Sequence, residues 1–288
     1  DEPWFKTKET VMEHLHSRTS AFWASVENVN KNIDILERKK RLDIKYNIIV
    51  PFYNAERWIE KCIQSVKRQR YDNFQCILID DISNDQTLEK AATAIGNDSR
   101  FNIIVNEEKQ YALKNISMAI DTIKDPKEED IVVILDGDDW LASSLVLSRL
   151  NEEYLDENCF ATYGSYVFHP WGIRGPEPSQ YPESVIENNY FREDVWRASH
   201  LRTFRYGLWK NIDHDDLKDE NGEYYTMAYD QAIMLPILEM SGERCRYIDD
   251  ILHVYNKENP LNVDKIKALK QSETAKEIRQ KRKYNRIK

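Results

Sequence analysis

The sequence contains no long apolar run. Its longest aliphatic stretches, Ile48–Val50 and Ile131–Leu135, are far shorter than the roughly 20 apolar residues that a membrane-spanning helix needs. The mean hydropathy of −0.70 also argues against a membrane-spanning helix. We therefore expect no transmembrane span.

Cysteine is also scarce, and its spacing does not predict a metal site built from cysteines. The four cysteines, Cys62, Cys76, Cys159 and Cys245, have no metal-ligand spacing and are predicted to be free, packed thiols. The chain also shows no secretory signal and begins with Asp1 instead of Met. We expect a fragment of a longer protein or a processed one, soluble and either cytoplasmic or part of a larger bacterial or viral protein.

Positive charge is in deficit, which argues against nucleic acid as a partner. The chain has 41 basic and 50 acidic residues, a net charge of −9. The end of the chain is the exception, because Lys265–Lys288 holds ten basic and two acidic residues. We expect residues 259–288 to form a basic helical tail on the surface, with a weak apolar face at Ile266, Leu269 and Ile278. It would be either solvated or in contact with an acidic membrane or a neighbouring domain.

Residues 1–44 carry apolar side chains in a heptad-like pattern that predicts a helical extension or connector. The stripe consists of Leu15, Phe22, Val26, Val29, Ile33 and Leu36. It is shorter than most coiled coils, so a helix packed on the main domain and a dimerising helix both remain open. A homodimer through this helix is one predicted partnership.

From Tyr46 onward the sequence alternates predicted strands with predicted helices. The expected strands are Ile48–Val50, Gln75–Ile79, Phe101–Val105 and Ile131–Leu135. The expected helices are Ala55–Gln69, Gln86–Ala94 and Lys109–Ile123. Aliphatic strands separated by helices predict βαβ units, hence an α/β fold with a mostly parallel central sheet flanked by helices.

The regular alternation ends near residue 150. Tyr163–Phe168 predicts one more strand, His169–Pro182 a long loop rich in proline, Met227–Met240 a helix, and Arg246–Tyr255 a short strand pair. We therefore divide the main domain, residues 45–258, into a first half at 45–150 and a second half at 151–258.

Polar residues follow the predicted strands directly, at the sheet edge where open α/β sheets bind ligands. Strand one is followed by Pro51-Phe52-Tyr53-Asn54, strand two by Asp80-Asp81, and strand four by Asp136-Gly137-Asp138-Asp139-Trp140. Clustered carboxylates repel one another unless a cation neutralises them. A divalent Mn²⁺ or Mg²⁺ bound together with a polyphosphate is the natural solution.

These three segments, in this order and spacing, resemble the family 2 glycosyltransferases of the GT-A fold, a Rossmann-like fold for nucleotide-diphospho-sugar transferases. Lys114-Asn115 resembles the family's Arg-Asn pair, and Tyr229-Asp230-Gln231 resembles the segment with the catalytic base, with Tyr229 in place of the common Glu. The resemblance covers about residues 46–255. It implies that 45–150 is the nucleotide-sugar-binding half and 151–258 the acceptor half.

The resemblance also implies a set of roles. Asp230 would be the general base of an inverting transfer of a hexose from a UDP-sugar to an acceptor hydroxyl, whether that acceptor is a glycan, a protein or a lipid. Asp138 and Asp136 of the Asp-x-Asp motif would bind the metal, with His253 as a further ligand or, equally, a packing residue. The expected contacts to the sugar nucleotide are Pro51, Tyr53, Asn54, Asp80, Asp81, Lys109, Lys114, Asn115, Asp136, Gly137 and Trp140. The segment His200–Arg205 resembles an acceptor-side segment of some members.

Two other functions fit less well. A nucleotidyltransferase should carry a glycine-rich loop after strand one, where this chain has Pro51-Phe52-Tyr53-Asn54. A non-catalytic domain that binds sugar nucleotides within a larger protein remains the alternative, and turnover of a sugar nucleotide separates it from an enzyme.

Overall fold

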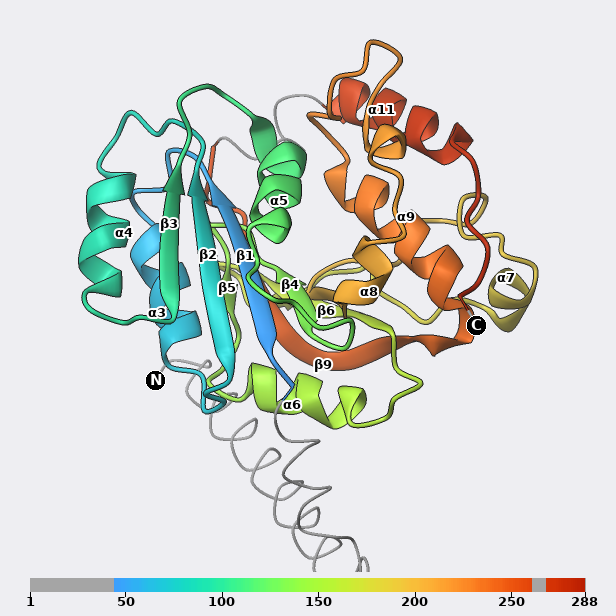
Figure 1. Cartoon of the computed structure of the whole chain (residues 1–288), viewed down its shortest axis with the longest axis horizontal. Coiled ribbons are helices and arrows are strands. Elements are labelled where there is room, and N and C mark those ends of the chain that lie inside the picture. Colours follow the sequence, from blue (N-terminus) through green and yellow to red (C-terminus); the bar gives the residue numbers. More distant parts are fainter. Residues whose placement is uncertain (1–43, 261–267, 288) are drawn as a thin grey trace, which may run out of the picture. The chain divides into compact units, whose positions relative to one another are not determined.

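The computed structural model describes residues 44–260 and 268–287 (Figure 1). The predicted stripe and dimerisation helix of the N-terminal segment lie outside these residues. Within the described ranges, no helix combines the length and the apolar character that crossing a bilayer requires.

The first half is a parallel sheet with helices on both faces. Strands β1 (Tyr46–Phe52), β2 (Phe74–Asp80), β3 (Phe101–Val105) and β4 (Ile131–Ile134) lie in the order β3-β2-β1-β4. Helices α3 (Ile59–Lys67) and α4 (Thr87–Ile95) share a core cluster with Ile48 and Val50, whereas α5 (Tyr111–Asp121) shares the other cluster with Ile49. Successive β1 side chains thus enter opposite layers, as strand geometry requires. The predicted βαβ half is confirmed.

The rest of the sheet has mixed strand directions, and most of its strands come from the second half. Beyond β4 come β8 (Arg202–Arg205), β6 (Ala161–His169), β9 (Cys245–Asn256) and β5 (Trp140–Leu141). The β6–β9 pair is parallel, and the β4–β8, β8–β6 and β9–β5 pairs are antiparallel. The other helices of the described residues are α6 (Val146–Tyr154), α7 (Glu183–Glu187), α8 (Tyr206–Trp209), α9 (Tyr229–Ser241) and α11 (Ala268–Gln280), with short 3₁₀ turns η1 (His214–Leu217) and η2 (Gly242–Arg244).

Two predicted elements of this half are wrong in detail. The expected strand pair at 246–255 is the single strand β9, because register shifts against β6 near Ser165 absorb the irregularity around Asp249 and Asp250. The expected loop at 169–182 contains a further strand, β7 (Ile173–Arg174), which pairs with β6.

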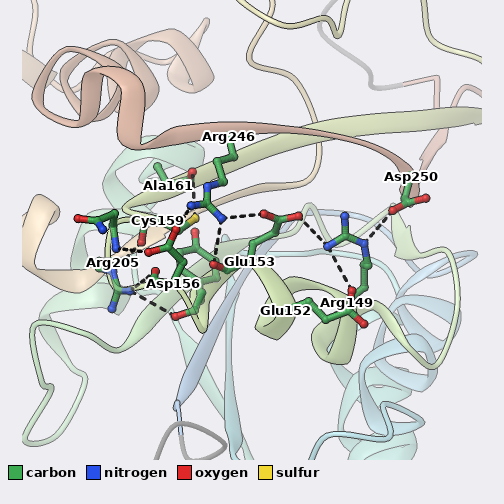
Figure 2. A network of polar contacts seen from close by, with 11 residues as sticks. Arg149, Glu152, Glu153, Asp156, Cys159, Ala161, Arg205, Arg246 and Asp250 are labelled. Carbon is green, nitrogen blue, oxygen red and sulfur yellow. Dashed lines mark hydrogen bonds and ion pairs between the residues drawn. The ribbon is translucent and has the colours of Figure 1, made fainter. Parts of the chain in front are cut away.

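A network of ion pairs joins α6 to β9 (Figure 2). Arg149 contacts Asp250 at 2.8 Å and Glu153 at 2.9 Å, and Arg246 contacts Glu153 at 3.1 Å and also pairs with Asp156. Single exposed ion pairs stabilise little, but a network restricts the geometry of the elements that it joins. It fixes β9, the strand that carries His253, against α6.

The C-terminal segment differs from its prediction as a surface element. Leu269 is 84% exposed, as expected for a residue on a surface helix. Ile278, in contrast, is only 1% exposed and belongs to the main core cluster. Its basic side chains also pair with the body of the protein, since Arg282 contacts Asp213 and Asp216 at 2.7 Å each. The described part of the tail is therefore a docked element. The predicted domain boundaries stay predictions.

Candidate active site

A pocket opens where β1, β2 and β4 end. Of the residues predicted to contact a sugar nucleotide or metal, those that line it are Pro51, Tyr53, Asp81, Asn115, Asp136, Gly137 and Asp138. Phe52, Ala55, Ala112 and Asn259 complete the lining and were not predicted. The topology explains the agreement, because the carboxyl ends of neighbouring parallel strands meet at one edge of the sheet.

Gly137 allows the turn after β4 to lie directly against β1. A Cβ at this position would lie 2.4 Å from the Cβ of Phe52 and 3.2 Å from the carbonyl oxygen of Pro51. The Gly137 N–H donates to that same carbonyl at 3.1 Å. A residue without a side chain thus lets Asp136 and Asp138 approach the end of β1.

The surroundings of Asp138 disfavour ionisation of its carboxyl group. Burial, followed by the charges of Asp139 and Asp136, raises its pKa to about 8. Hydrogen bonds offset part of this rise, among them the one that Asn259 Nδ2 donates to Asp138 Oδ2 at 2.7 Å. A group of carboxylates this crowded has the oxygen ligands and the negative charge that suit a hard divalent cation.

Asp136 lies at the centre of a second group of contacts, which joins the two halves of the domain. The Tyr229 hydroxyl donates to Asp136 Oδ1 at 2.5 Å and to Oδ2 at 2.7 Å. Arg202, only 2% exposed, places its guanidinium 3.9 Å from Asp136 and 3.7 Å from Asp230. One buried cation therefore lies between the Asp-x-Asp motif and the predicted base.

Arg202 is the main residue whose importance the sequence did not reveal. It lies in the segment His200–Arg205, which was predicted only as acceptor-side. Burial alone would lower its pKa, but Tyr229, Asp230 and Asp136 raise it overall, so the guanidinium stays charged. The sequence predicts no strand at Arg202 and gives no signal that this arginine is buried, and Asn259 likewise belongs to no recognisable motif.

His253 is buried and contacts Asp139, a neighbour of the Asp-x-Asp motif. Its Nε2 lies 2.8 Å from Asp139 Oδ2, and Asn256 N–H donates to Asp139 Oδ1 at 2.7 Å. Burial lowers the pKa of His253 to about 3, so its ring is neutral. Pairing of β5 with β9 sets Leu141 opposite His253 and brings Asp139 nearby.

His200 stacks on His253 with ring centroids 4.4 Å apart. The possible ligand atoms of Asp139, His200 and His253 all lie within 4.8 Å of one another, which makes them a second candidate metal group. Its accessibility differs from that of Asp138, because Asp139 and His253 are at most 1% exposed and do not line the pocket.

Asp81 is ionised at the opposite wall of the pocket. Burial would raise its pKa, but hydrogen bonds from the Gln110 N–H and the Asn106 side chain, together with the charge of Lys109, lower it overall. The Gln110 N–H lies 2.7 Å from Asp81 Oδ1 and Lys109 Nζ lies 3.2 Å from Oδ2. The structure thus brings Lys109 beside the pocket without placing it in the lining.

Four other predicted contacts lie outside the pocket lining. Asn54 and Asp80 brace the loops around it, because Asn54 Oδ1 accepts from Asn84 N–H and Asp80 Oδ1 accepts from Ser83 N–H. Trp140 packs under Lys61, whose Nζ lies 3.5 Å from the ring centroid. Lys114 is half-buried on α5.

Comparison with known proteins decides the family. The model of "Glycosyl transferase family 2" matches residues 47–214, more than half of the chain. The chain belongs to this family. The match contains the two strand ends and the Asp-x-Asp motif on which the predicted resemblance rested.

Relatives and solved structures agree with this result. An uncharacterized glycosyltransferase, EpsJ of Bacillus subtilis, is 26% identical over 76% of this chain and 63% of its own length. The Escherichia coli glucosyltransferase WfgD is 34% identical over 43% of this chain and 46% of its own. The crystal structure of S. aureus TarS 1-349 in complex with UDP-GlcNAc has a TM-score of 0.58 at 19% identity, covering 75% of this chain and 59% of TarS 1-349. The predicted GT-A fold is confirmed.

The chain spans less than two thirds of the length of these relatives, 63% in EpsJ and 46% in WfgD. The family and fold are thus established for this stretch of sequence, whereas donor, acceptor and mechanism need an argument from the site itself.

Proposed function

We propose that the protein is an inverting, metal-dependent glycosyltransferase that moves a hexose from a UDP-sugar to an acceptor hydroxyl. The observation that carries the proposal is the position of Arg202, 3.9 Å from Asp136 at the pocket and 3.7 Å from Asp230 on α9. A donor site and a base on separate elements, kept close by one cation, suit a reaction between two substrates that bind from opposite sides.

The nucleoside would bind between Tyr53 and Asp81. Tyr53 is 38% exposed at the pocket and offers a ring face for stacking, and the ionised Asp81 offers an oxygen that could accept from a uracil N–H. Lys109 supplies positive charge next to both, since its Nζ lies 2.8 Å from the Tyr53 ring centroid. Relatives support uridine, because TarS was solved with UDP-GlcNAc and WfgD is named for UDP-Glc.

A divalent cation, Mn²⁺ or Mg²⁺, would be held by Asp138 and Asp136, which line the pocket where the diphosphate would lie. When bound it would act as a Lewis acid and offset the charge of the departing diphosphate. Ionisation of Asp138 is unfavourable without a nearby positive charge, and a bound divalent cation would supply that charge. His253 would contribute through its hydrogen-bonded neighbour Asp139, or as a ligand in the group with His200.

Asp230 would take the proton from the acceptor hydroxyl. As the O–H bond breaks, the oxygen forms a bond to the anomeric carbon from the face opposite the diphosphate, and the bond from that carbon to the phosphate oxygen breaks. This geometry inverts the anomeric configuration. Arg202, 3.7 Å away, would hold the Asp230 carboxylate in place until the acceptor arrives.

No contact described in the pocket identifies the class of acceptor. The first acceptor to test is therefore taken from a relative. The printed name of WfgD gives a GlcNAc-diphosphoundecaprenol acceptor. A lipid-linked amino sugar is accordingly the first acceptor to test, ahead of proteins and free glycans. The alternative function, a non-catalytic domain that binds sugar nucleotides, predicts binding without turnover of any donor.

The test is a panel of nucleotide sugars with Mn²⁺, scored for slow hydrolysis without an acceptor. We expect one UDP-sugar to be hydrolysed faster than its GDP and ADP counterparts, and chelation of the metal to stop the reaction. Proton NMR of the first sugar released should show the anomer opposite to that of the donor. Binding of UDP-sugars with no hydrolysis would favour the non-catalytic alternative, and a retained configuration would refute inversion.

A further inference from the structure

The described part of the C-terminal tail, residues 268–287, binds along α9, the helix whose first turn carries Asp230. We infer that Arg279 of this tail is a positioning residue for the proposed base, acting through Gln231. The inference rests on the proposed function, since it concerns the same site.

The contacts of Arg279 lie at the start of α9. Its Nε donates to Gln231 Oε1 at 2.9 Å, and its Nη1 donates to the carbonyl oxygens of Arg192 and Asp194 at 2.7 Å each. Hydrogen bonds from a charged guanidinium are stronger and more directional than neutral ones. The side chain next to Asp230 is therefore tied to two backbone carbonyls through one rigid group.

The first turn of α9 needs such support because it has no cap of its own. The N-cap residue, Ala228, has a φ of 50° and makes no side-chain hydrogen bond to the helix. Pro236 inside the helix also lacks an N–H for the helical hydrogen-bond ladder. Tertiary contacts must therefore set the position of Asp230. On the pocket side they come from Arg202 and from the hydrogen bonds of Tyr229 to Asp136. On the other side they come from Arg279, through Gln231.

The tail holds the other end of the same helix as well. Arg192 forms a buried two-bond pair with Glu239, at 2.6 and 2.9 Å, and donates to the Ile278 carbonyl at 2.7 Å. Tyr284 N–H donates to Glu239 Oε2 at 3.0 Å. These anchors do not involve Gln231, so the tail can remain docked when the Arg279–Gln231 bond is removed.

The decisive experiment compares Arg279→Gln, Gln231→Ala and the double variant with Arg282→Gln as a matched control. Arg282 lies on the same tail but pairs with Asp213 and Asp216 instead of α9. Three quantities are measured for each protein: the kcat for hydrolysis of the UDP-sugar that the wild type hydrolyses fastest, the Kd of UDP in Mn²⁺, and the Tm.

We expect kcat to fall about tenfold in Arg279→Gln and in Gln231→Ala, because displacement of a catalytic group by a fraction of an ångström is costly. The double variant should fall no further than either single variant, the Kd of UDP should stay within about twofold, and Arg282→Gln should keep the wild-type kcat. Arg279→Lys should restore part of the loss. If Arg279→Gln does not fold, Gln231→Ala carries the test alone, because the Arg192 and Glu239 anchors remain.

Some results would overturn the inference. They are additive losses in the double variant, a parallel loss of UDP affinity, or an equal fall in Arg282→Gln, each of which indicates a general structural role. An unchanged kcat in Gln231→Ala would do the same while leaving the proposed function intact. If the wild type hydrolyses no UDP-sugar, the proposed function itself fails.

Discussion

At the scale of single residues, the pocket is shaped by charges that are costly to bury together. Asp138 is the clearest case, since burial and its acidic neighbours raise its pKa to about 8. A carboxyl group whose pKa is higher in the folded than in the unfolded chain binds its proton more tightly when folded. Folding is therefore destabilised as the pH rises from the ordinary carboxyl range towards 8.

This linkage predicts the behaviour of Asp138→Asn, in which an oxygen can still accept from Asn259. Without divalent cations, the Tm of the wild type should fall between pH 5 and pH 8 by about 2 °C or more beyond any fall in the variant. Added Mn²⁺ should raise the Tm of the wild type at pH 8 and leave the variant unchanged. Thermal unfolding in a chelator and in Mn²⁺ measures both effects, and parallel pH profiles for the two proteins would rule out the account of Asp138.

Arg202 gives a second prediction at this scale. Arg202→Met keeps much of the buried volume but leaves Asp136 and Asp230 without their cation. We expect the hydrolysis rate of the UDP-sugar to drop at least tenfold, together with some loss of stability. Arg205→Met is the control, because Arg205 lies on the same strand and donates to the Cys159 carbonyl away from the pocket. Equal rates in the two variants would contradict a role for Arg202 at the site.

At the scale of elements, the close approach of β1 and the turn after β4 builds the floor of the pocket. Gly137→Ala should destabilise the fold by about 1–3 kcal/mol, because the added Cβ overlaps Phe52 and the strands must separate. UDP affinity should fall as well. Gly207→Ala is a milder comparison, since its nearest contact would be Glu128 Cβ at 3.1 Å. Chemical denaturation and calorimetry measure the two effects, and a Gly137→Ala variant as stable as Gly207→Ala would show that the turn can yield.

The sequence predicts some elements better than others. Elements that arise from a local pattern are predicted well, whereas those that depend on contacts with distant residues are not. Ile48–Val50 and Ile131–Leu135 are uninterrupted aliphatic runs, and a strand covered by helices on both faces has that composition. In β9, Asp249 and Asp250 resemble a turn, whereas pairing with β6 carries the strand through them. The tail has a weak apolar pattern because hydrogen bonds and ion pairs dock it as much as Ile278 does.

At the scale of the whole molecule, the candidate site combines residues from both halves of the sheet. The strand-end aspartates could be predicted, because parallel strands gather their ends and the motifs are local in sequence. The contact of Tyr229 with Asp136 joins positions 93 apart, and Arg202 comes from the antiparallel strand β8. Such pairings depend on how the second half folds back, which no local pattern encodes.

The central claim is that Asp230 acts as the base opposite a donor bound at the Asp-x-Asp motif, and Asp230→Asn tests it most directly. Asparagine keeps the size of the side chain but cannot take a proton, so hydrolysis of the UDP-sugar should fall by roughly 10²-fold or more. The Kd of UDP in Mn²⁺ should stay close to that of the wild type, because no donor contact is removed. Near-normal hydrolysis in Asp230→Asn would contradict the account and assign the base to another residue.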